Sequence, residues 1–381
     1  MISKKYSALA AGFALALTVT ACSGGGAGSG SDDTSVAPED ATVGVSMPTQ
    51  TSERWIADGD AVEAGLKEAG YEVNLQFAGD EIPTQQQQID QMITQGVDLL
   101  IIAAIDGTAL SSQLDAAAAE GIPVISYDRL IRENENVDFY VTFDNYQVGV
   151  QQATSLLTGL GLVTPAGPGT ATGPFNIELF AGSLDDNNAH FFYQGAIDTL
   201  QPYIDGGQIV VKSGQTEIEQ IATLRWLQET AQKRMEDLLT SSYGGGAEPL
   251  HGVLSPYDGI SRGIITALQN AGYGPTQAEG LPIVTGQDAE IASIKLINED
   301  VQHATIFKDT RKLADQAIIS AEAFLSGEEP EANDTKSYDN GVKVVPSYLL
   351  ESDIVYKGDI QSLLVDSGYW TEAEVASGQA E

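Results

Sequence analysis

Polar and charged side chains directly follow several apolar runs of the chain, and their types suit hydrogen bonding to hydroxyl groups. Asp128 and Arg129 come immediately after the apolar run at residues 122–127. Asp288 and Lys308 end two later runs in the same way. The carboxyl ends of parallel strands meet at one edge of an open α/β sheet, and ligands bind in the crevice there. Carboxylates and cations at such an edge predict a ligand covered in hydroxyls, of which a sugar is the simplest.

The chain has three tryptophans, and Trp55 is expected beside that crevice. It begins a helix-like stretch just after the first strand-like run. A pyranose ring has two faces of C–H groups, which aromatic rings cover while the hydroxyls stay free for polar partners. A helix tryptophan usually packs in a core, and that alternative stays open for Trp55. We interpret Trp370, near the C-terminus, as a packing residue.

The first half of the chain alternates strand-like and helix-like patterns. Apolar runs predict strands, and the stretches between them have helical spacing and end at glycines such as Gly70, Gly96 and Gly121. This βαβ alternation predicts a parallel, doubly wound α/β sheet. The expected strands are 41–47, 71–78, 97–104 and 122–127, and the expected helices are 53–69, 83–94 and 108–120.

A second series of the same kind begins after Asp144. Two doubly wound domains in one chain commonly face each other across a cleft, and a hinge closes them over a ligand. The pattern therefore predicts a site between two sets of strand ends. A loop rich in Pro and Gly interrupts this series at 161–174 and has no assigned role. The expected strands are 175–180, 208–212, 250–254, 283–285 and 304–307, and the expected helices are 146–160, 187–203 and 218–239.

Length, composition and charge limit the class of protein. A chain of 381 residues with 42% hydrophobic content is long enough for two domains with sizeable cores. The formal net charge of -36 makes nucleic acid a poor partner, because no basic stripe offsets phosphate repulsion. We interpret the acidity as a well-hydrated surface.

The first residues predict export and a lipid anchor. Lys4 and Lys5 precede an apolar stretch at 8–19 that is too short to span a bilayer. The small residues before Cys22 resemble a bacterial lipobox, so we expect a signal peptide at 1–21, a lipidated Cys22 and a flexible tether at 22–40. An ordinary cleavable signal with a chance cysteine is the alternative. Cys22 is the single cysteine, so an intramolecular disulfide is excluded.

Nine short strings, taken together and in order, carry a family resemblance that extends from about residue 42 to 370. The chain resembles the periplasmic multiple-monosaccharide-binding proteins and, next, the xylose-binding proteins. These are solute receptors of sugar ABC importers with the type I periplasmic-binding-protein fold. The strings lie at 52–55, 126–132, 142–145, 175–180, 185–189, 255–259, 286–289, 306–310 and 340–350.

The resemblance implies a hinge of three segments, near residues 144, 308 and 345. One lobe would then contain 41–144 and 308–345, and the other 145–307 and 346–381. It also implies a monomer that delivers a pyranose of the xylose, glucose, galactose or arabinose type to an ABC permease. A sugar co-receptor for a membrane sensor kinase is the alternative.

The resemblance assigns sugar contacts to charged residues that local sequence leaves ambiguous. Asp128 and Asp288 would accept hydrogen bonds from hydroxyls, and Arg54, Arg129 and Lys308 would donate them. Asp288 has an alternative as the N-cap of a helix. For Asp128 and Arg129 the alternative is a surface turn, and for Arg54 and Lys308 a solvated surface charge.

The resemblance also assigns Asn187, Asn188, Trp226, Tyr257 and Asp258 to the sugar site. Trp226 would be the stacking aromatic of the second domain. Asn187 and Asp258 have helix-capping roles as alternatives.

Enzyme and metal chemistry find little support in the sequence. Two carboxylates at a cleft are also compatible with a glycosidase. Such an enzyme needs an acid with a raised pKa, however, and the nearby cations would lower it. His190, His251 and His303 form no metal-ligand pair, and the chain has neither a nucleophile elbow nor a phosphate loop. We expect no cofactor and no metal.

Overall fold

The structure is a computed structural model that describes residues 38–380. The predicted signal peptide and Cys22 lie outside the described residues, as does all of the predicted tether except its last three. Those three form a short 3-10 helix, η1 (Pro38–Asp40), with exposed side chains.

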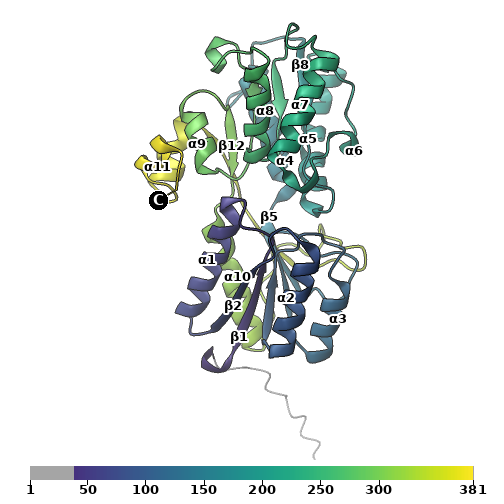
Figure 1. The fold of residues 1–381 in the computed structure, drawn as a ribbon, viewed down its shortest axis with the longest axis vertical. Helices are drawn as coiled ribbons and strands as arrows, with labels where there is room; N and C mark the ends of the chain where they lie inside the picture. The colour runs from purple at the N-terminus through teal and green to yellow at the C-terminus, as the bar shows by residue number, and fades with distance from the viewer. Residues whose placement is uncertain (1–37, 381) are drawn as a thin grey trace, which may run out of the picture. The chain divides into compact units, whose positions relative to one another are not determined.

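The first lobe is built on a six-stranded sheet with the order β13-β5-β4-β3-β1-β2, whose paired strands are all parallel. Successive side chains of a strand point to opposite faces. In β3, Leu99 and Ile101 therefore pack with α1 and α10, whereas Leu100 and Ile102 pack with α2 and α3. Figure 1 shows these helices around the lower sheet. The strands are β1 (Thr42–Met47), β2 (Glu72–Phe77), β3 (Leu99–Ile102), β4 (Val124–Tyr127), β5 (Phe139–Phe143) and β13 (Ser347–Leu350), and the helices are α1 (Glu53–Glu68), α2 (Ile82–Gln95), α3 (Ser111–Glu120) and α10 (Thr310–Leu325).

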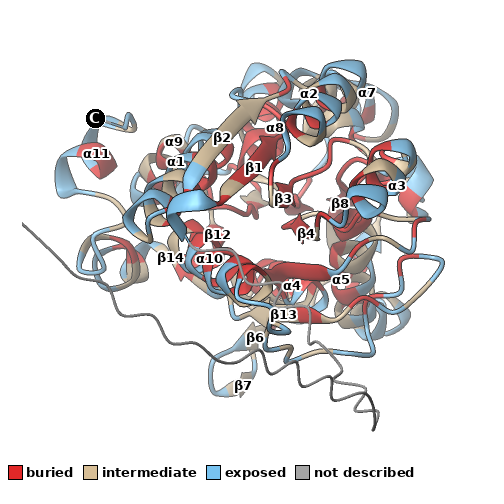
Figure 2. Ribbon diagram, turned by 90° about the horizontal axis from the view of Figure 1, so that it is seen from below, coloured by how far each residue is buried: buried red, intermediate tan, exposed pale blue. Residues whose placement is uncertain are grey.

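The second lobe contains a four-stranded parallel sheet with the order β11-β10-β8-β9. Helices α4 and α5 pack on one face of it and α7 and α8 on the other. Figure 2 shows the buried strands between helices whose outer surfaces are exposed. The strands are β8 (Phe175–Leu179), β9 (Ile209–Val211), β10 (Gly252–Leu254) and β11 (Ile283–Val284), and the helices are α4 (Asn145–Gly159), α5 (Asn187–Asp205), α7 (Gln228–Ser242) and α8 (Asp258–Asn270).

A smaller layer completes the second lobe. Strand β12 (Ala304–Phe307) pairs antiparallel with β14 (Asp353–Tyr356), and a parallel bridge joins Gln287 to Ile306. Trp370 packs here, as expected, and its indole N–H donates to the carbonyl of Ala289 at 2.9 Å. The remaining elements are β6 (Val163–Thr164) and β7 (Gly167–Pro168) in the Pro- and Gly-rich loop, α6 (Ile218–Ile221), η2 (Leu224–Trp226), η3 (Gln277–Glu279), α9 (Ile291–Asn298), η4 (Lys357–Asp359), η5 (Ile360–Val365) and α11 (Glu372–Ser377).

The fold class is as predicted, an α/β protein with parallel sheets, but the third crossing between the lobes comes later than expected. The family resemblance implies a crossing near residue 345, whereas β13 pairs with β5 and so belongs to the first sheet. Pro346 already takes part, because its carbonyl accepts from Tyr140 N at 3.0 Å. The chain therefore crosses after Leu350, just before β14.

The predicted helix 218–239 is wrong, because the chain breaks it into α6, η2 and α7. Arg225 and Trp226 have positive φ values of 55° and 59°, which no α-helix contains. The cause is tertiary pairing. Residues 221–223 pair with the chain that continues β8, through Ala181 N to Ile221 O at 2.9 Å and Thr223 N to Gly182 O at 3.1 Å. These bonds replace the helical ones and set up the turn that carries Trp226.

Candidate functional site

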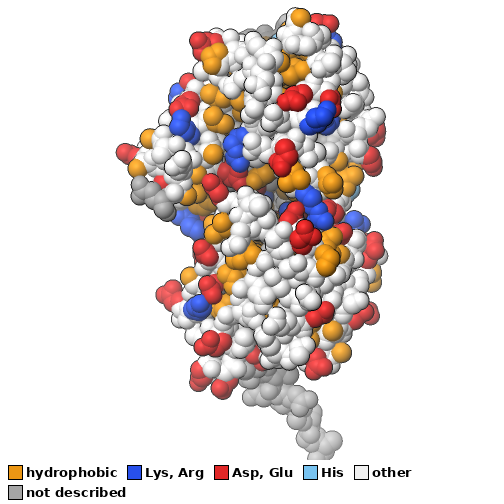
Figure 3. Space-filling view, in the orientation of Figure 1, with side chains coloured by type: hydrophobic (Ala, Val, Ile, Leu, Met, Phe, Trp, Pro, Cys, Tyr) orange, Lys and Arg blue, Asp and Glu red, His pale blue; other side chains and the backbone are white. Residues whose placement is uncertain are grey.

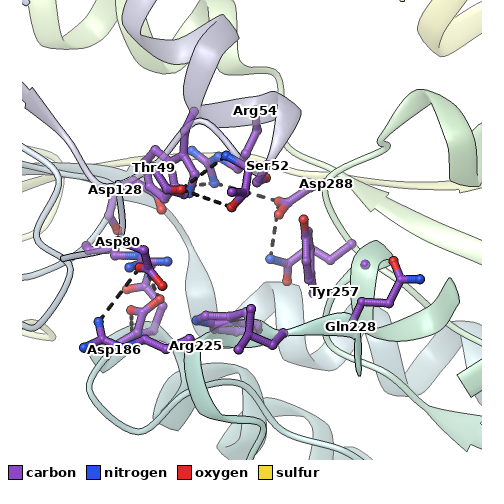
Figure 4. A pocket seen from close by; sticks show the side chains of 18 of the residues that line it. Thr49, Ser52, Arg54, Asp80, Asp128, Asp186, Arg225, Gln228, Tyr257 and Asp288 are labelled. Atoms are coloured by element: carbon purple, nitrogen blue, oxygen red, sulfur yellow. Dashed lines mark hydrogen bonds and ion pairs between the residues drawn. The ribbon is translucent and has the colours of Figure 1, made fainter. Parts of the chain in front are cut away.

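A cavity of about 350 Å³ lies between the two lobes. This volume is at the small end of the range for ligand pockets, as suits a single-ring ligand. Figure 4 shows polar side chains from both lobes that point into it. The lining includes Thr49, Ser52, Arg54, Trp55, Asp80, Asp128 and Arg129 from the first lobe, Asp186, Asn188, Phe192, Arg225, Trp226, Tyr257, Gln287 and Asp288 from the second, and Lys308 at the second crossing.

Strand ends supply much of this lining. Thr49 follows β1, Asp80 follows β2 and Asp128 follows β4 in the first lobe, while Lys308 follows β12. The structure thus brings Asp128 and Lys308 to one cavity, as expected from their positions at strand ends. Asp80 obeys the same rule and could have been found by it.

Arg54 is the central cation of the cavity. Its Nη1 lies 3.1 Å from Asp128 Oδ1 and 3.8 Å from Asp288 Oδ1. Lys308 Nζ lies 3.1 Å from the same oxygen of Asp288. The four side chains are at most 9% exposed, so their charges act on one another with little screening by solvent.

This arrangement keeps Asp128 ionised. Burial alone would raise the pKa of Asp128, but Arg54, Lys308 and Arg129 together hold the pKa below its ordinary value. Burial would likewise lower the pKa of Arg54, and Asp128, Asp58 and Asp288 raise it instead. Asp128 therefore offers acceptor oxygens at neutral pH.

Arg129 connects the end of β4 in the first lobe to the second lobe. Its Nε lies 3.1 Å from Asp186 Oδ2, and its Nη1 donates to the carbonyl of Ala104 at 3.2 Å. Burial raises the pKa of Asp186, and Arg129 partly offsets this rise. The pair is a connection between lobes that the sequence did not reveal.

Trp55 lines the cavity but gives it little surface, since it is only 4% exposed. The guanidinium carbons of Arg54 and Arg129 lie 4.4 and 5.0 Å from its ring centroid. Such contacts are cation–π interactions. The ring packs in the core of the first lobe and supports the two arginines, so the packing alternative describes Trp55 better than a freely offered stacking surface.

Trp226 is a half-buried aromatic residue of the cavity. It makes edge contacts with Phe192 and Tyr257 at centroid distances of 6.3 and 6.2 Å. A Cβ added at Gly182 would overlap its ring, so the indole rests on the bare backbone of that glycine. Its indole nitrogen is buried and has no hydrogen-bond partner among the described residues. Nothing in the sequence indicates that Phe192 and Gly182 contact this tryptophan.

Backbone strain is concentrated at the cavity. Eight non-glycine residues of the described chain have positive φ, and five of them line it: Asp80, Asp128, Arg225, Trp226 and Asp288. This conformation is uncommon for residues other than glycine, and such outliers cluster at ligand sites. The carbonyl of Asp128 accepts three hydrogen bonds, from Tyr140, Thr142 and Asn188, which hold the residue in this state.

The helix-capping alternatives for three predicted residues do not hold. Glu290 is the N-cap of α9, so Asp288 is not. Asp186 caps α5 and accepts from Asn188 N at 2.9 Å, so Asn187 does not. Tyr257 occupies the N-cap position of α8, which leaves Asp258 as its first helical residue.

Two predicted sugar contacts, Asn187 and Asp258, are not among the residues that line the cavity. Asp258 is fully buried and accepts from Glu290 N at 2.9 Å and from Gln302 Nε2 at 2.8 Å. Burial raises its pKa well above the ordinary value. Because both oxygens bond the protein, Asp258 supports the wall behind Tyr257 and does not face the cavity.

Asn188 does line the cavity, yet the protein already uses its amide. Its Oδ1 accepts from Tyr140 Oη at 2.9 Å and from Asn145 Nδ2 at 3.0 Å, and its Nδ2 donates to the carbonyl of Asp128 at 2.8 Å. It thereby joins α5 of the second lobe to the strand ends of the first.

Direct contacts between the lobes close the cavity at two places. At one, Ser52 Oγ donates to Glu290 Oε1 at 3.1 Å. At the other, Gly107 N donates to the carbonyl of Asp185 at 3.1 Å, and Arg225 Nη1 lies 3.5 Å from Asp185 and 3.9 Å from Asp80. Figure 3 shows basic and acidic side chains side by side where the lobes meet.

Residues 38–380 have neither a candidate metal site nor a candidate membrane-spanning helix. This part of the chain contains no group of three or more His, Cys, Asp or Glu side chains placed to hold a metal ion. Nor does it contain a helix with the length and hydropathy needed to cross a membrane.

Comparison with known proteins adds independent information. Residues 43–329 match the periplasmic binding protein domain. The chain is 53% identical to the multiple sugar-binding periplasmic receptor ChvE of Rhizobium radiobacter, over 88% of this chain and 92% of that protein. It is 34% identical to the D-xylose-binding periplasmic protein of Escherichia coli, over 88% and 93% of the two chains.

A solved structure is similar over nearly its whole length. The ABC transporter solute-binding protein of Clostridium phytofermentans, crystallised with bound β-D-glucose, is 46% identical, with a TM-score of 0.82. The match covers 88% of this chain and 99% of the other.

Proposed function

Since the chain belongs to the family of periplasmic binding proteins that includes the multiple sugar-binding receptors, we propose that it captures monosaccharides outside the cytoplasm for an ABC importer. The resemblance and fold class predicted from the sequence are confirmed, and the chain is a binding protein and not an enzyme. The observation that carries the proposal is the convergence of Asp128, Asp288, Arg54 and Lys308 on one cavity of single-ring size.

The chemistry of the cavity suits a neutral pyranose. Asp128 and Asp288 are acceptors for hydroxyl groups, and Arg54 and Lys308 are donors that also hold these carboxylates. The acidic and basic groups offset each other, which favours a ligand without net charge. Trp226 covers one apolar face of the ring, with Tyr257 at its edge.

The proposed ligands are pyranoses of the xylose, glucose, galactose or arabinose type. Xylose and glucose appear in the names of two of the similar proteins described above, and they are the first to test. Arg54, Asp128, Arg129, Asp288 and Lys308 are the residues that we assign to hydroxyl contacts. Asn187 and Asp258 are left out of this set because they do not line the cavity.

Closure couples binding to transport in this proposal. The ligand bridges groups of both lobes, so it favours the closed conformation through its differential affinity for the two states. A permease that recognises the closed arrangement then distinguishes loaded receptors from empty ones. We propose that the receptor acts as a monomer.

A lipid anchor at Cys22 is a further part of the proposal, supported by the basic, apolar and small residues that precede this cysteine. Mass spectrometry of the protein expressed in a bacterial host is expected to show a diacylglyceryl group on Cys22. A Cys22→Ala variant should lose membrane association. Release of unmodified protein cleaved elsewhere would contradict the anchor and leave the sugar site untouched.

A thermal-shift screen over monosaccharides tests the proposed function. A ligand at 100 times its dissociation constant adds about 2.7 kcal/mol to the free energy of unfolding. We expect D-glucose or D-xylose to raise the melting temperature, and isothermal titration to give a dissociation constant near the micromolar range. The absence of a shift with all aldopentoses and aldohexoses would overturn the proposal.

A further inference from the structure

Asp58 is a buried carboxylate that does not line the cavity, yet it holds the cation at its centre. The side chain is fully buried on α1, one turn after Arg54. Its Oδ2 accepts from Arg54 Nε at 2.9 Å and from Arg54 Nη2 at 2.8 Å. These bonds fix the plane of the guanidinium and leave Nη1 to face Asp128 and Asp288.

The second oxygen of Asp58 is held from a different element. Tyr127, the fully buried last residue of β4, donates its hydroxyl to Asp58 Oδ1 at 2.5 Å. Tyr127 directly precedes Asp128 in the chain. The side chains of Tyr127, Asp58 and Arg54 therefore lead back to Asp128 and form a closed loop, which ties helix α1 to the strand end that carries the acceptor.

We propose, on the basis of the proposed function, that Asp58 and Tyr127 are positioning residues that set sugar affinity by fixing the guanidinium of Arg54. Neither residue touches the cavity, so their effect on a ligand passes through Arg54. A donor held within a narrow range of orientations loses less freedom on binding than a mobile one. Without Asp58, Arg54 is free to turn toward Asp128 alone and is no longer aimed at a ligand.

A purely structural role is the competing explanation, and the chain contains a matched example of one. In the core of the second lobe, Tyr243 donates its hydroxyl to Glu178 Oε1 at 2.7 Å, and both residues are fully buried. Glu178 also accepts from Ser213 N and Oγ, at 3.0 and 2.6 Å. Neither Tyr243 nor Glu178 lines the cavity. Tyr243→Phe is thus a control that removes the same kind of bond far from Arg54.

The ionisation of Asp58 gives a second readout. Burial raises its pKa to about 6, although Arg54 and the Tyr127 hydroxyl act to lower it. The charged or titratable groups that face Asp58 are Arg54 on its own helix, Tyr127 and Asp128 at the end of β4, and Tyr369 from the C-terminal segment. As the pH falls through about 6, Asp58 takes up a proton and loses its charge attraction for Arg54. Sugar affinity is then expected to fall.

The test measures D-glucose affinity by isothermal titration, from pH 5 to pH 8, for the wild type, Tyr127→Phe, Asp58→Asn and Tyr243→Phe. At pH 7 we expect Tyr127→Phe to weaken binding roughly tenfold and Asp58→Asn roughly fiftyfold. Loss of the Tyr127 hydroxyl raises the pKa of Asp58 further, so the acid fall in affinity should begin at a higher pH in Tyr127→Phe. That part of the pH dependence should vanish in Asp58→Asn.

Tyr243→Phe should keep the wild-type affinity and pH profile while lowering the melting temperature of the free protein. The inference is overturned if Tyr127→Phe and Tyr243→Phe lose stability alike but both bind glucose as the wild type does. Tyr127→Phe removes a single oxygen, and it keeps the test decisive if Asp58→Asn does not fold. A wild type that binds none of the aldopentoses and aldohexoses would instead overturn the proposed function, together with this inference.

Discussion

The two walls of the cavity are built by opposite means. The wall of the first lobe is a buried charge network, in which Asp58 holds Arg54 and three hydrogen bonds hold the carbonyl of Asp128. The wall of the second lobe near Trp226 is a strained turn. There Arg225 is 24% exposed, and the indole nitrogen has no partner within the described chain. Asp128 Oδ1 and Arg129 Nε in the first wall have ion-pair partners but no hydrogen bond, whereas the indole nitrogen of Trp226 in the second wall has neither among the described residues.

The two walls are therefore expected to contribute differently to ligand binding. A preorganised donor and acceptor set gives orientation and specificity, because its geometry is fixed before the ligand arrives. A partly satisfied, half-buried turn gains contacts only when the ligand is present, which is what couples binding to closure. Asp288 and Lys308 lie between these extremes, since they join the network from the second lobe and from a crossing strand.

The largest effect is expected at Asp288, where the two walls meet. Asp288→Asn removes a charged acceptor but leaves an oxygen for Lys308, so the free protein should still fold. Loss of one partner in a buried charged contact costs about 3–4 kcal/mol, which raises the dissociation constant by roughly two to three orders of magnitude. Titration calorimetry measures this loss, and thermal unfolding checks the free protein.

Asp258→Asn is the matched control for that variant. Asp258 is buried and accepts hydrogen bonds from Glu290 and Gln302 behind the wall. We therefore expect the variant to lower the melting temperature of the free protein with little effect on sugar affinity. A sugar affinity lost equally in both variants would place Asp258 at the site and contradict the assignment made from the cavity.

A smaller effect is expected at Trp226, the aromatic of the strained wall. Trp226→Ala should weaken pyranose binding by about 2–3 kcal/mol, as for other aromatic hot spots, and change the stability of the free protein less. Trp370→Ala is the control, because Trp370 packs against Ala289 and lies outside the cavity. Equal glucose affinity in Trp226→Ala and the wild type, by titration, would remove the indole from the site.

The smallest effect is expected at Gly182, which does not reach the ligand itself. In Gly182→Ala the new methyl group overlaps the Trp226 ring and forces the turn to shift. We expect about a tenfold loss of affinity, or ~1.4 kcal/mol, and a change in the fluorescence of Trp226 in the free protein. Unaltered fluorescence and affinity would mean that the turn moves without cost and that its contact with Gly182 does not fix the position of Trp226.

Much of the fold follows from local sequence signals. Fully apolar strands and glycine-terminated helices predict the parallel α/β architecture, and β1, β3 and β12 lie within or at the runs expected for them. The strand-end rule also brings Asp128, Asp288 and Lys308 to one cavity. These features can be predicted because the apolar pattern of a strand, and the polar residue that follows it, are visible without knowing which other strand pairs with it.

The tertiary structure decided what depends on pairing between distant segments. The helix expected at 218–239 breaks because residues 221–223 bond the chain after β8, and this break aims Trp226 at the cavity. β13 joins the first sheet because it pairs with the edge of β5, so the third crossing does not fall near residue 345. Asp258 does not face the cavity because its two oxygens accept hydrogen bonds from Glu290 N and Gln302 Nε2. By itself the sequence determined which polar residues follow the strands. Only the packing decided which polar side chains face a ligand and which, like Asp58, hold others in place. The reason is that the orientation of a side chain and its hydrogen-bond partners depend on segments far apart in the chain.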